Sequence, residues 1–432
     1  MQQAIRSSIA VVLTCAGVAL AGEPDGKAPA DQKRVALTNY ALNSHIRMLD
    51  GQWQGTILAS DGNVYFGGGS HNPELGAAFF RYDPRTGELK LLVKNITTVC
   101  GEDPKKTPPQ GKIHSPVVEH EGWIYFGTHL ANYTEEGRKA YTGAHLVGYQ
   151  LATGRFRDFG VIHPNYTNYS ALGLDARRGR IWFYATPFYE GEGSRLYWVD
   201  IASGKKHDLG LVARWSNRRD HGPPAFACYV DGRGDCWLSV RYERTLYVGR
   251  AESGKVEAFA DALPEIVEKA PNKDRWRAVR PLDDNRALLL MAGSLWVFDS
   301  REAPRGKNTF TRLCEMDPSA RIECFAFGGG RVYWTSRTKQ DAPTHLVSVP
   351  LENPKAMYDH GVIAEGQERQ PMFAGDLITD GLGKVYMAGR WSVSEADMQT
   401  IGILRHKLRM AVFFSVLDVR EDLRRISSGK AT

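Results

Sequence analysis

The chain has 432 residues, of which 42% are hydrophobic and 24% are charged, a composition typical of a folded protein with a sizeable buried core. Lys and Arg (55) exceed Asp and Glu (49), which gives a formal net charge of +6. This mild excess suits an acidic ligand, but it is too small to indicate a nucleic-acid-binding protein.

The N-terminal segment, residues 1–21, has the features of a secretory signal peptide. Arg6 provides a positive start, a mostly apolar run extends from Ile9 to Leu20, and a small-x-small cleavage site ends at Ala21. The apolar run is too short to span a membrane, and no later stretch is long and apolar enough. We therefore expect a secreted or periplasmic protein cleaved near Ala21. A lipoprotein attached at Cys15 is the less favoured alternative.

A turn glycine followed by a short β-rich run recurs along the rest of the chain. Seven copies are marked by Gly62, Gly122, Gly179, Gly234, Asn285, Gly330 and Gly383. A second turn follows several of them, in the segments DPRTGEL, LATGRF, IASGKK and AESGKV. Each repeat thus contains two hairpins and four short strands, which is the unit of a propeller blade. We predict an all-β fold, a seven-bladed β-propeller.

Such a ring must also be closed between its first and last blades. The last repeat contains a strand at 409–419, and the segment 34–42 can pair with it and supply the fourth strand. We therefore place one domain at residues 34–420, closed by pairing of the N- and C-terminal strands. Residues 22–33, rich in Pro, Ala, Asp and Lys, are expected to form a disordered linker, and residues 421–432 a charged C-terminal tail.

Five cysteines follow the signal segment, and their state has three interpretations. In an oxidising compartment Cys228 can pair with Cys236 and Cys314 with Cys324, which leaves Cys100 free. His221 with Cys228 and Cys236 can instead help to bind a structural zinc, although no CxxC motif is present. Plain buried thiols are the favoured interpretation.

Two histidines flank the hairpin of the second repeat, in the segment GKIHSPVVEHEGWIYFGTH at residues 111–129. His114 lies eight residues before Gly122, and His129 lies seven residues after it. Both should therefore lie at the same end of the first two strands of one blade, at the rim of the central channel. We expect the two imidazoles to meet there.

The other repeats align with the second in the same register. Three of them carry arginine seven residues after the turn marker, and Ser170 aligns with Ser115, which makes Tyr169 equivalent to His114. The rim predicted in this way contains His114, His129, Tyr169, Arg241, Arg277, Arg321, Arg337 and Arg390. Each arginine alone is better explained as a structural or solvated group, and a lone histidine as a structural group, but the set as a whole favours an anion-binding face.

An anion-binding face without a carboxylate pair limits the chemistry. Glycosidases normally use two carboxylates at a set separation, and no serine-hydrolase, zinc-protease or phosphate-loop motif is present. Histidine, tyrosine and arginine suit β-elimination in a uronate polysaccharide instead. Hydrogen bonds to the carboxylate stabilise the enolate-like transition state, one group removes the C5 proton, and another protonates the departing O4. No redox cofactor is required.

The segment at 111–129, followed by YTGAHLVGYQLATG from Tyr141, resembles the second-blade region of secreted bacterial seven-bladed propeller lyases of the ulvan lyase type. The resemblance implies cleavage of an anionic, sulfated polysaccharide next to a uronate. It also implies a functional set of two histidines on one blade, with tyrosine and arginine on following blades. His114, His129 and Tyr169 match this set. The arginine is displaced, and Arg241, one blade on, is the substitute.

We therefore expect a polysaccharide lyase. His114 and His129 would neutralise the carboxylate or transfer protons, Tyr169 would act as acid or base, and Arg241 would clamp the carboxylate. Further substrate-binding candidates are Tyr184, Tyr242, Arg277, Arg321, Arg337 and Arg390. The resemblance also implies a structural zinc or calcium, for which His221, Cys228 and Cys236 are the candidates.

The expected partner is an anionic polysaccharide, bound by a monomer that has no membrane span and binds no nucleic acid. The alternative hypothesis is a non-catalytic propeller that binds an anionic glycan or a protein partner through the same face. In that case the two histidines belong to the structure of the hairpin ends.

Overall fold

The computed structural model describes residues 32–131, 133–189, 191–214, 222–265, 276–316, 322, 324–337, 342–366, 369–394, 396, 398 and 410–429. The predicted signal peptide and nearly all of the predicted linker lie outside these residues, as do His221 and Arg321. The domain limits drawn from the sequence stay predictions. Within the described residues, no helix has the length and apolar character that crossing a membrane requires.

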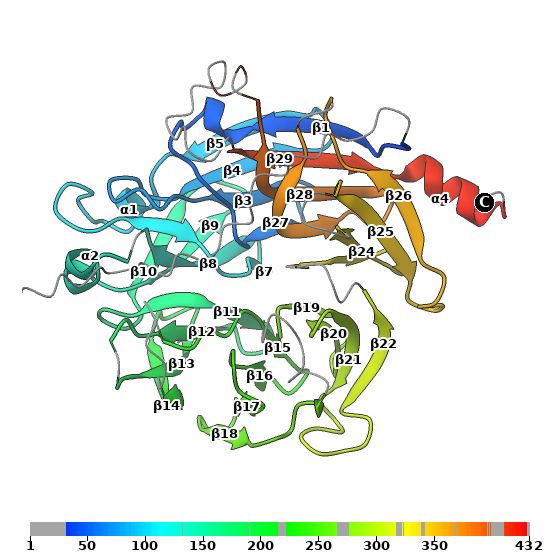
Figure 1. Ribbon diagram of the computed structural model, residues 1–432. Coiled ribbons are helices and arrows are strands. Elements are labelled where there is room, and N and C mark those ends of the chain that lie inside the picture. The colour runs from blue at the N-terminus through cyan, green and yellow to red at the C-terminus, as the bar shows by residue number, and fades with distance from the viewer. Residues whose placement is uncertain are drawn as a thin grey trace, which may run out of the picture.

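Seven antiparallel sheets are arranged around a central axis, which confirms the predicted seven-bladed β-propeller (Figure 1). Blade 1 consists of β2 (Thr56–Leu58), β3 (Val64–Gly68), β4 (Ala78–Asp83) and β5 (Glu88–Val93). Blade 2 consists of β6 (Gln110–Ile113), β7 (Val118–His120), β8 (Trp123–Leu130), β9 (His145–Gln150) and β10 (Phe156–Val161). Blade 3 consists of β11 (Thr167–Asp175), β12 (Arg180–Thr186), β13 (Gly193–Asp200) and β14 (Lys206–Arg214).

Blade 4 consists of β15 (Cys228–Val230), β16 (Cys236–Ser239), β17 (Leu246–Gly249) and β18 (Val256–Phe259). Blade 5 consists of β19 (Ala278–Pro281), β20 (Arg286–Met291), β21 (Ser294–Asp299) and β22 (Phe310–Glu315). Blade 6 consists of β23 (Ala326–Gly328), β24 (Arg331–Ser336), β25 (His345–Pro350) and β26 (Tyr358–Val362). Blade 7 consists of β27 (Pro371–Thr379), β28 (Lys384–Ser392), β29 (Met410–Asp418) and β1 (Ala36–Ala41). The short helices are η1 (Leu42–Ser44), α1 (Ile96–Val99), α2 (Glu135–Ala140) and α4 (Arg420–Ser427).

The seven turn markers all lie between the first and second strands of their blades. Gly122, between β7 and β8, has φ 73°, and the other five marker glycines likewise have positive φ, which glycine adopts without steric cost. The fifth marker is Asn285, and its turn is stabilised differently. The Asp283 carboxylate accepts hydrogen bonds from the backbone N–H groups of Asn285 and Arg286, both at 2.8 Å. A side-chain cap thus replaces the glycine.

The N-terminal strand closes the ring as predicted. β1 pairs antiparallel with β29, from Ala36 opposite Asp418 to Ala41 opposite Phe413. It therefore forms the outermost strand of blade 7, whose other strands come from the C-terminal end of the described chain (Figure 1). This pairing covers an edge that β29 would otherwise expose.

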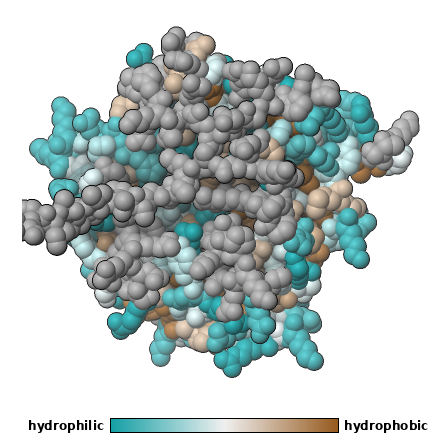
Figure 2. Space-filling view, viewed as in Figure 1, coloured by the Kyte–Doolittle hydropathy of each residue, from teal (hydrophilic) through white to brown (hydrophobic). Residues whose placement is uncertain are grey.

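The core is divided among the blades rather than gathered at one centre. Seven clusters of buried hydrophobic side chains fill the seven interfaces between neighbouring sheets. Between blades 7 and 1, for example, the rings of Phe66 and Phe414 stack with centroids 4.5 Å apart. Figure 2 shows mainly hydrophilic side chains along much of the outer edge of the molecule. The first strands of most neighbouring blades contact one another, so they surround the axis.

The five cysteines in the described residues are all free thiols. The Cys228–Cys236 and Cys314–Cys324 disulfides considered from the sequence are therefore not formed. Cys228 and Cys236 lie on the adjacent strands β15 and β16. Burial raises the pKa of Cys236 well above the ordinary value.

Candidate functional site

The first strand of blade 2 is interrupted, and His114 lies in the interruption. β6 and β7 both pair with β8, and His114 directly follows β6. Its Nδ1 lies 2.8 Å from Oγ of Ser170 on the neighbouring blade, which fixes the orientation of the imidazole. The break in the strand therefore turns His114 toward blade 3.

His129 lies on β8, and its ring is fixed at both nitrogens. Nδ1 is 3.0 Å from the Asn168 carbonyl oxygen and 2.7 Å from Oγ1 of Thr167. A carbonyl only accepts, so in the neutral ring Nδ1–H donates to it, and Nε2 accepts a hydrogen bond from the Tyr133 hydroxyl. Blade 3 thus holds the second histidine as well.

The structure brings His114, His129 and Tyr169 together. The ring centroids are 5.2 Å apart for His114 and His129, 4.6 Å for His114 and Tyr169, and 5.1 Å for His129 and Tyr169. Tyr169 comes from β11, the innermost strand of blade 3. His114 is 5% exposed and His129 is fully buried, whereas Tyr169 is half-buried. Tyr169 therefore presents the most accessible of the three rings.

Lys112 is a charged member of this site that the sequence pattern did not indicate. It lies on β6 opposite His129 in the strand register and is 2% exposed. Its ammonium group lies over the rings of Trp53, at 5.0 Å, and Tyr133, at 4.8 Å. Within the described residues, no carboxylate lies within ion-pair distance of it. Burial lowers the pKa of Lys112 to about 7.

Trp53 connects Lys112 and His114 to blade 7. Its ring stacks on His114, with centroids 5.9 Å apart and an interplanar angle of 11°. The Arg390 guanidinium lies 5.2 Å from the Trp53 centroid, and its Nε donates to the Asp50 carbonyl at 2.5 Å. Burial opposes ionisation of Asp50, but hydrogen bonds from His71 and the charge of Arg390 lower its pKa overall. Asp50 is therefore an anion that already has Arg390 and His71 as partners.

Phe226, like Trp53, contacts both a ring of the site and an arginine side chain. The ring centroids of Phe226 and Tyr169 are 5.6 Å apart. The Arg277 guanidinium lies 4.1 Å from the Phe226 centroid, and that of Arg241 lies 5.7 Å from it and 4.8 Å from Tyr242. Two predicted arginines, from blades 4 and 5, thus contact Phe226, which in turn contacts Tyr169. We call Trp53, Lys112, His114, His129, Tyr169 and Phe226 the rim cluster.

Two of the predicted site residues have other surroundings. Tyr184 is fully buried between blades 3 and 4, and its hydroxyl donates to the Pro223 carbonyl at 2.7 Å, so it packs in the core and does not line the rim. The Arg337 guanidinium donates to Oγ1 of Thr344 and to the Pro371 carbonyl, which fixes it within blades 6 and 7. Arg321 and His221 lie outside the described residues.

Side chains from non-adjacent blades also meet across the axis. Nη2 of Arg280, on β19, lies 2.9 Å from Oδ1 of Asp376, on β27, and the other carboxylate oxygen accepts from the Thr56 backbone N–H at 3.1 Å. Gln54 donates to the Phe226 carbonyl at 3.2 Å. These contacts join blades 1, 4, 5 and 7 across the channel.

The comparisons with known proteins bear on the fold alone. Neither a scan against protein-family models nor a search of curated protein sequences finds a match. Among solved structures, the chain is similar to a streptogramin B lyase, with a TM-score of 0.52 and 14% identity over 88% of this chain and 98% of that one. It is also similar to U3-55K, with a TM-score of 0.51 and 9% identity over 88% and 98%.

A third similar structure is a virginiamycin B lyase from Staphylococcus aureus, solved with quinupristin, with a TM-score of 0.51 and 13% identity over 88% of this chain and all of that one. At these identities the likeness defines the class of protein, a seven-bladed β-propeller. It does not distinguish an enzyme from a binding module, and it does not address the ulvan lyase type.

Proposed function

We propose that this propeller is a polysaccharide lyase, which cleaves a uronate-containing anionic polysaccharide by β-elimination. The observation that carries the proposal is the convergence of His114, His129 and Tyr169, whose ring centroids lie 4.6–5.2 Å apart. An imidazole and a phenol within reach of one sugar ring provide both the proton acceptor and the proton donor that elimination needs.

The proposed reaction removes the proton at C5 of the uronate, next to its carboxylate. The electron pair of the C5–H bond forms the C4–C5 double bond, and the C4–O4 bond breaks with its electrons moving to O4. O4 then takes a proton from a donor on the protein, and no water is added. We assign the acid or base role to Tyr169 and proton transfer or carboxylate neutralisation to His114 and His129.

The carboxylate must be neutralised for its neighbouring proton to become removable. Arg241 and Arg277 approach Tyr169 through Phe226, and Lys112 lies on the strand directly before His114. We assign the carboxylate clamp to Arg241, and we add Lys112 as a second cation that attracts the carboxylate or a sulfate group. Arg390 and Tyr242 are the remaining substrate-binding candidates near the rim cluster.

One structural neighbour lends support to lyase chemistry on this fold. The virginiamycin B lyase with quinupristin is a histidine-to-alanine variant that is described as catalytically inactive. A propeller of the same architecture thus depends on a histidine for a lyase reaction. The proposal for the present chain rests on its own rim cluster, since the identity is only 13%.

The second candidate function is binding of an anionic glycan or protein partner without catalysis. The burial of His129 and the hydrogen bonding of both its ring nitrogens, to Thr167, Asn168 and Tyr133, favour this alternative, because a structural histidine shows the same features.

The lyase proposal also includes export from the cell, action as a monomer, and chemistry without a cofactor.

The test incubates the purified protein with a panel of uronate polysaccharides and follows the near-ultraviolet absorbance of the unsaturated product. The proposal expects a time-dependent rise with at least one sulfated or unsulfated uronate polymer. Binding to such a polymer with no rise on any of them would favour the non-catalytic alternative.

A further inference from the structure

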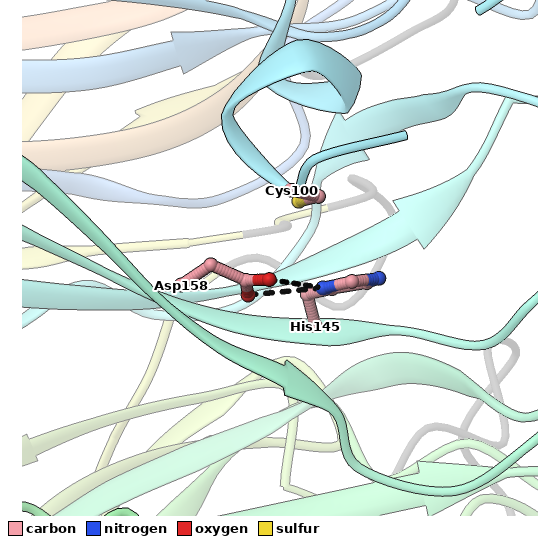
Figure 3. Close-up of side chains that lie close together, drawn as sticks. All are labelled: Cys100, His145 and Asp158. Carbon is pink, nitrogen blue, oxygen red and sulfur yellow. Dashed lines mark hydrogen bonds and ion pairs between the residues drawn. The ribbon is translucent and has the colours of Figure 1, made fainter. Parts of the chain in front are cut away.

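A second group of titratable side chains lies in blade 2, apart from the rim cluster. Cys100, His145 and Asp158 each offer one donor atom, and these three atoms all lie within 4.8 Å of one another (Figure 3). Cys100 caps the C-terminal end of α1, His145 begins β9, and Asp158 lies on β10. Three separate elements thus direct a sulfur, a nitrogen and an oxygen toward one point.

The local backbone explains how Asp158 reaches this point. The register between β9 and β10 shifts between Asp158 and Val161, which is the mark of a β-bulge, and Gly160 has φ 76°. The Gly160 backbone N–H donates to the Asp158 carboxylate at 2.8 Å and fixes its direction. The bulge therefore turns the carboxylate toward His145, where its two oxygens lie 2.9 and 3.1 Å from Nδ1.

The other ring nitrogen of His145, Nε2, lies near a second carboxylate, that of Glu102. Nε2 lies 3.3 Å from Oε1 of Glu102, whose carboxylate also accepts from Gln110 at 3.0 Å and from the Thr142 hydroxyl. Figure 3 shows Nδ1 facing Asp158 and the opposite ring nitrogen turned away. A histidine that gives one nitrogen to a metal commonly donates the N–H of the other to a carboxylate, which orients the ring and increases its basicity.

We propose that Cys100, His145 and Asp158 form a binding site for a zinc ion, with Sγ, Nδ1 and a carboxylate oxygen as ligands and Glu102 orienting His145. Thiolate, imidazole and carboxylate are the usual donors to zinc, whereas calcium and magnesium prefer oxygen donors alone. On binding, the ion replaces the proton between Nδ1 and Asp158 and that of the Cys100 thiol. Water takes the fourth tetrahedral position.

Burial supports a built site in preference to a chance meeting of polar groups. Cys100 is 7% exposed and His145 is 4% exposed, while the side chains of Glu102 and Asp158 are 9% and 23% exposed. Placing an imidazole between two carboxylates in such a position is costly unless the charges are compensated. A divalent cation compensates them, since two carboxylates and a thiolate bring three negative charges to the neighbourhood.

The position of the site suggests a structural role. α1 belongs to the connection between blades 1 and 2, while β9 and β10 are the outer strands of blade 2, so the ion would tie that connection to the blade. Glu102 extends the tie through Gln110 to β6, the strand that ends beside His114. The site thus stabilises the blade that carries both histidines without contacting substrate.

The alternative is a metal-free arrangement in which a positively charged His145 is clamped between Asp158 and Glu102. The two alternatives differ in the part of Cys100. A zinc ion needs the thiolate, whereas the clamped imidazolium does not.

The experiment measures zinc by mass spectrometry in the full chain after dialysis, together with Cys100→Ser and, as the matched control, Cys314→Ser, which changes a half-buried thiol far from this cluster. We expect about one zinc per chain in the wild type and in Cys314→Ser and none in Cys100→Ser. Replacement of zinc by cobalt should give a thiolate-to-cobalt absorption band in the wild type and no such band in Cys100→Ser. Zinc retained by Cys100→Ser, or a wild type without zinc, would overturn the assignment.

A variant that does not fold would leave the first measurement without meaning, so a second uses only the wild type. The protein is stripped with a chelator, its fold is checked by circular dichroism, and zinc is added back while the thermal midpoint is followed. The proposal predicts a midpoint that rises with zinc concentration and saturates at one equivalent. An unchanged midpoint in a folded, stripped protein contradicts it. Neither result depends on lyase activity.

Discussion

The rings of His114 and Tyr169 lie with their centroids 4.6 Å apart, although the two residues belong to different blades. The residue after Tyr169 reinforces the contact, because Oγ of Ser170 lies 2.8 Å from Nδ1 of His114. Blade 3 therefore supplies both the phenol that faces the imidazole and the hydroxyl that orients it. A substitution of either residue should therefore alter the orientation of the other side chain.

Removal of the proposed proton-transfer groups should abolish elimination without loss of the fold. We expect His114→Ala and Tyr169→Phe each to lower kcat by about 10²–10⁴-fold, the usual contribution of a general acid or base. His207→Ala, a change on the outermost strand of blade 3, should leave kcat unchanged. Initial rates of unsaturated-product formation test this, and wild-type turnover in both variants would show that these residues are not the reacting groups.

Ser170 should act as a positioning residue. Ser170→Ala leaves His114 in place but removes the group 2.8 Å from its Nδ1, so the ring gains freedom and its basicity changes. We expect kcat to fall by about 10-fold or more with little change in KM, and the pH profile of kcat to shift. A purely structural role of Ser170 would lower the thermal midpoint and leave the pH profile where it was.

Lys112 should couple anion binding to proton uptake. Because burial lowers its pKa to about 7, the free protein holds this side chain largely neutral at slightly alkaline pH. An anion bound beside it favours the ammonium form and raises the pKa again. Calorimetric titration at about pH 8 in buffers of different ionisation enthalpy should show uptake of up to about one proton. The same uptake in Lys112→Met would assign the effect to another group.

The same pKa shift makes a prediction about stability. The folded pKa of Lys112 lies below the unfolded value of about 10.5, so the fold disfavours the charged form. The cost is fully present below about pH 7 and disappears as the pH rises toward 10.5. Lys112→Met should therefore be more stable than the wild type at pH 7 by up to a few kcal/mol, with the difference shrinking at about pH 9. Urea unfolding at both pH values measures it, and a pH-independent difference contradicts it.

The Arg280–Asp376 pair should stabilise the centre of the ring. Burial raises the pKa of Asp376, while Arg280 works in the opposite direction. Arg280→Met leaves the carboxylate buried and uncompensated, which typically costs about 3–5 kcal/mol. Arg280→Met combined with Asp376→Asn should recover part of this loss. Denaturant unfolding of the single and double variants tests the coupling, and additive losses would show that the two side chains act independently.

The repeat pattern predicted the fold because each blade carries its own local signals. The turn glycines, of which Gly122 is one, fix the hairpins, and the alternating apolar runs supply the faces that pack between blades. Local signals of this kind do not need knowledge of distant contacts. The closing pair was predictable for a different reason: the last repeat supplies only β27, β28 and β29, so the fourth strand of blade 7 had to come from the N-terminal segment that forms β1.

The site was only partly predictable. Counting from the turn placed His114, His129 and Tyr169 at one rim, because strand length alone determines where a strand ends. Lys112 was missed because a strand pattern does not reveal that aromatic rings from two other segments cover an ammonium group. Tyr184 was included because it lies near the place, across the hairpin from Tyr169, where the family resemblance implies an arginine. Its side chain instead faces the interface with blade 4.

The decisive experiment for elimination is a nuclear magnetic resonance spectrum of the product formed from a uronate polysaccharide. We predict a C4–C5 double bond at the new non-reducing end, with the C5 proton lost and no oxygen taken from water, and none of this product with His114→Ala. A saturated new end that has gained water, or a polysaccharide that is bound but unchanged by the wild-type protein, would contradict it.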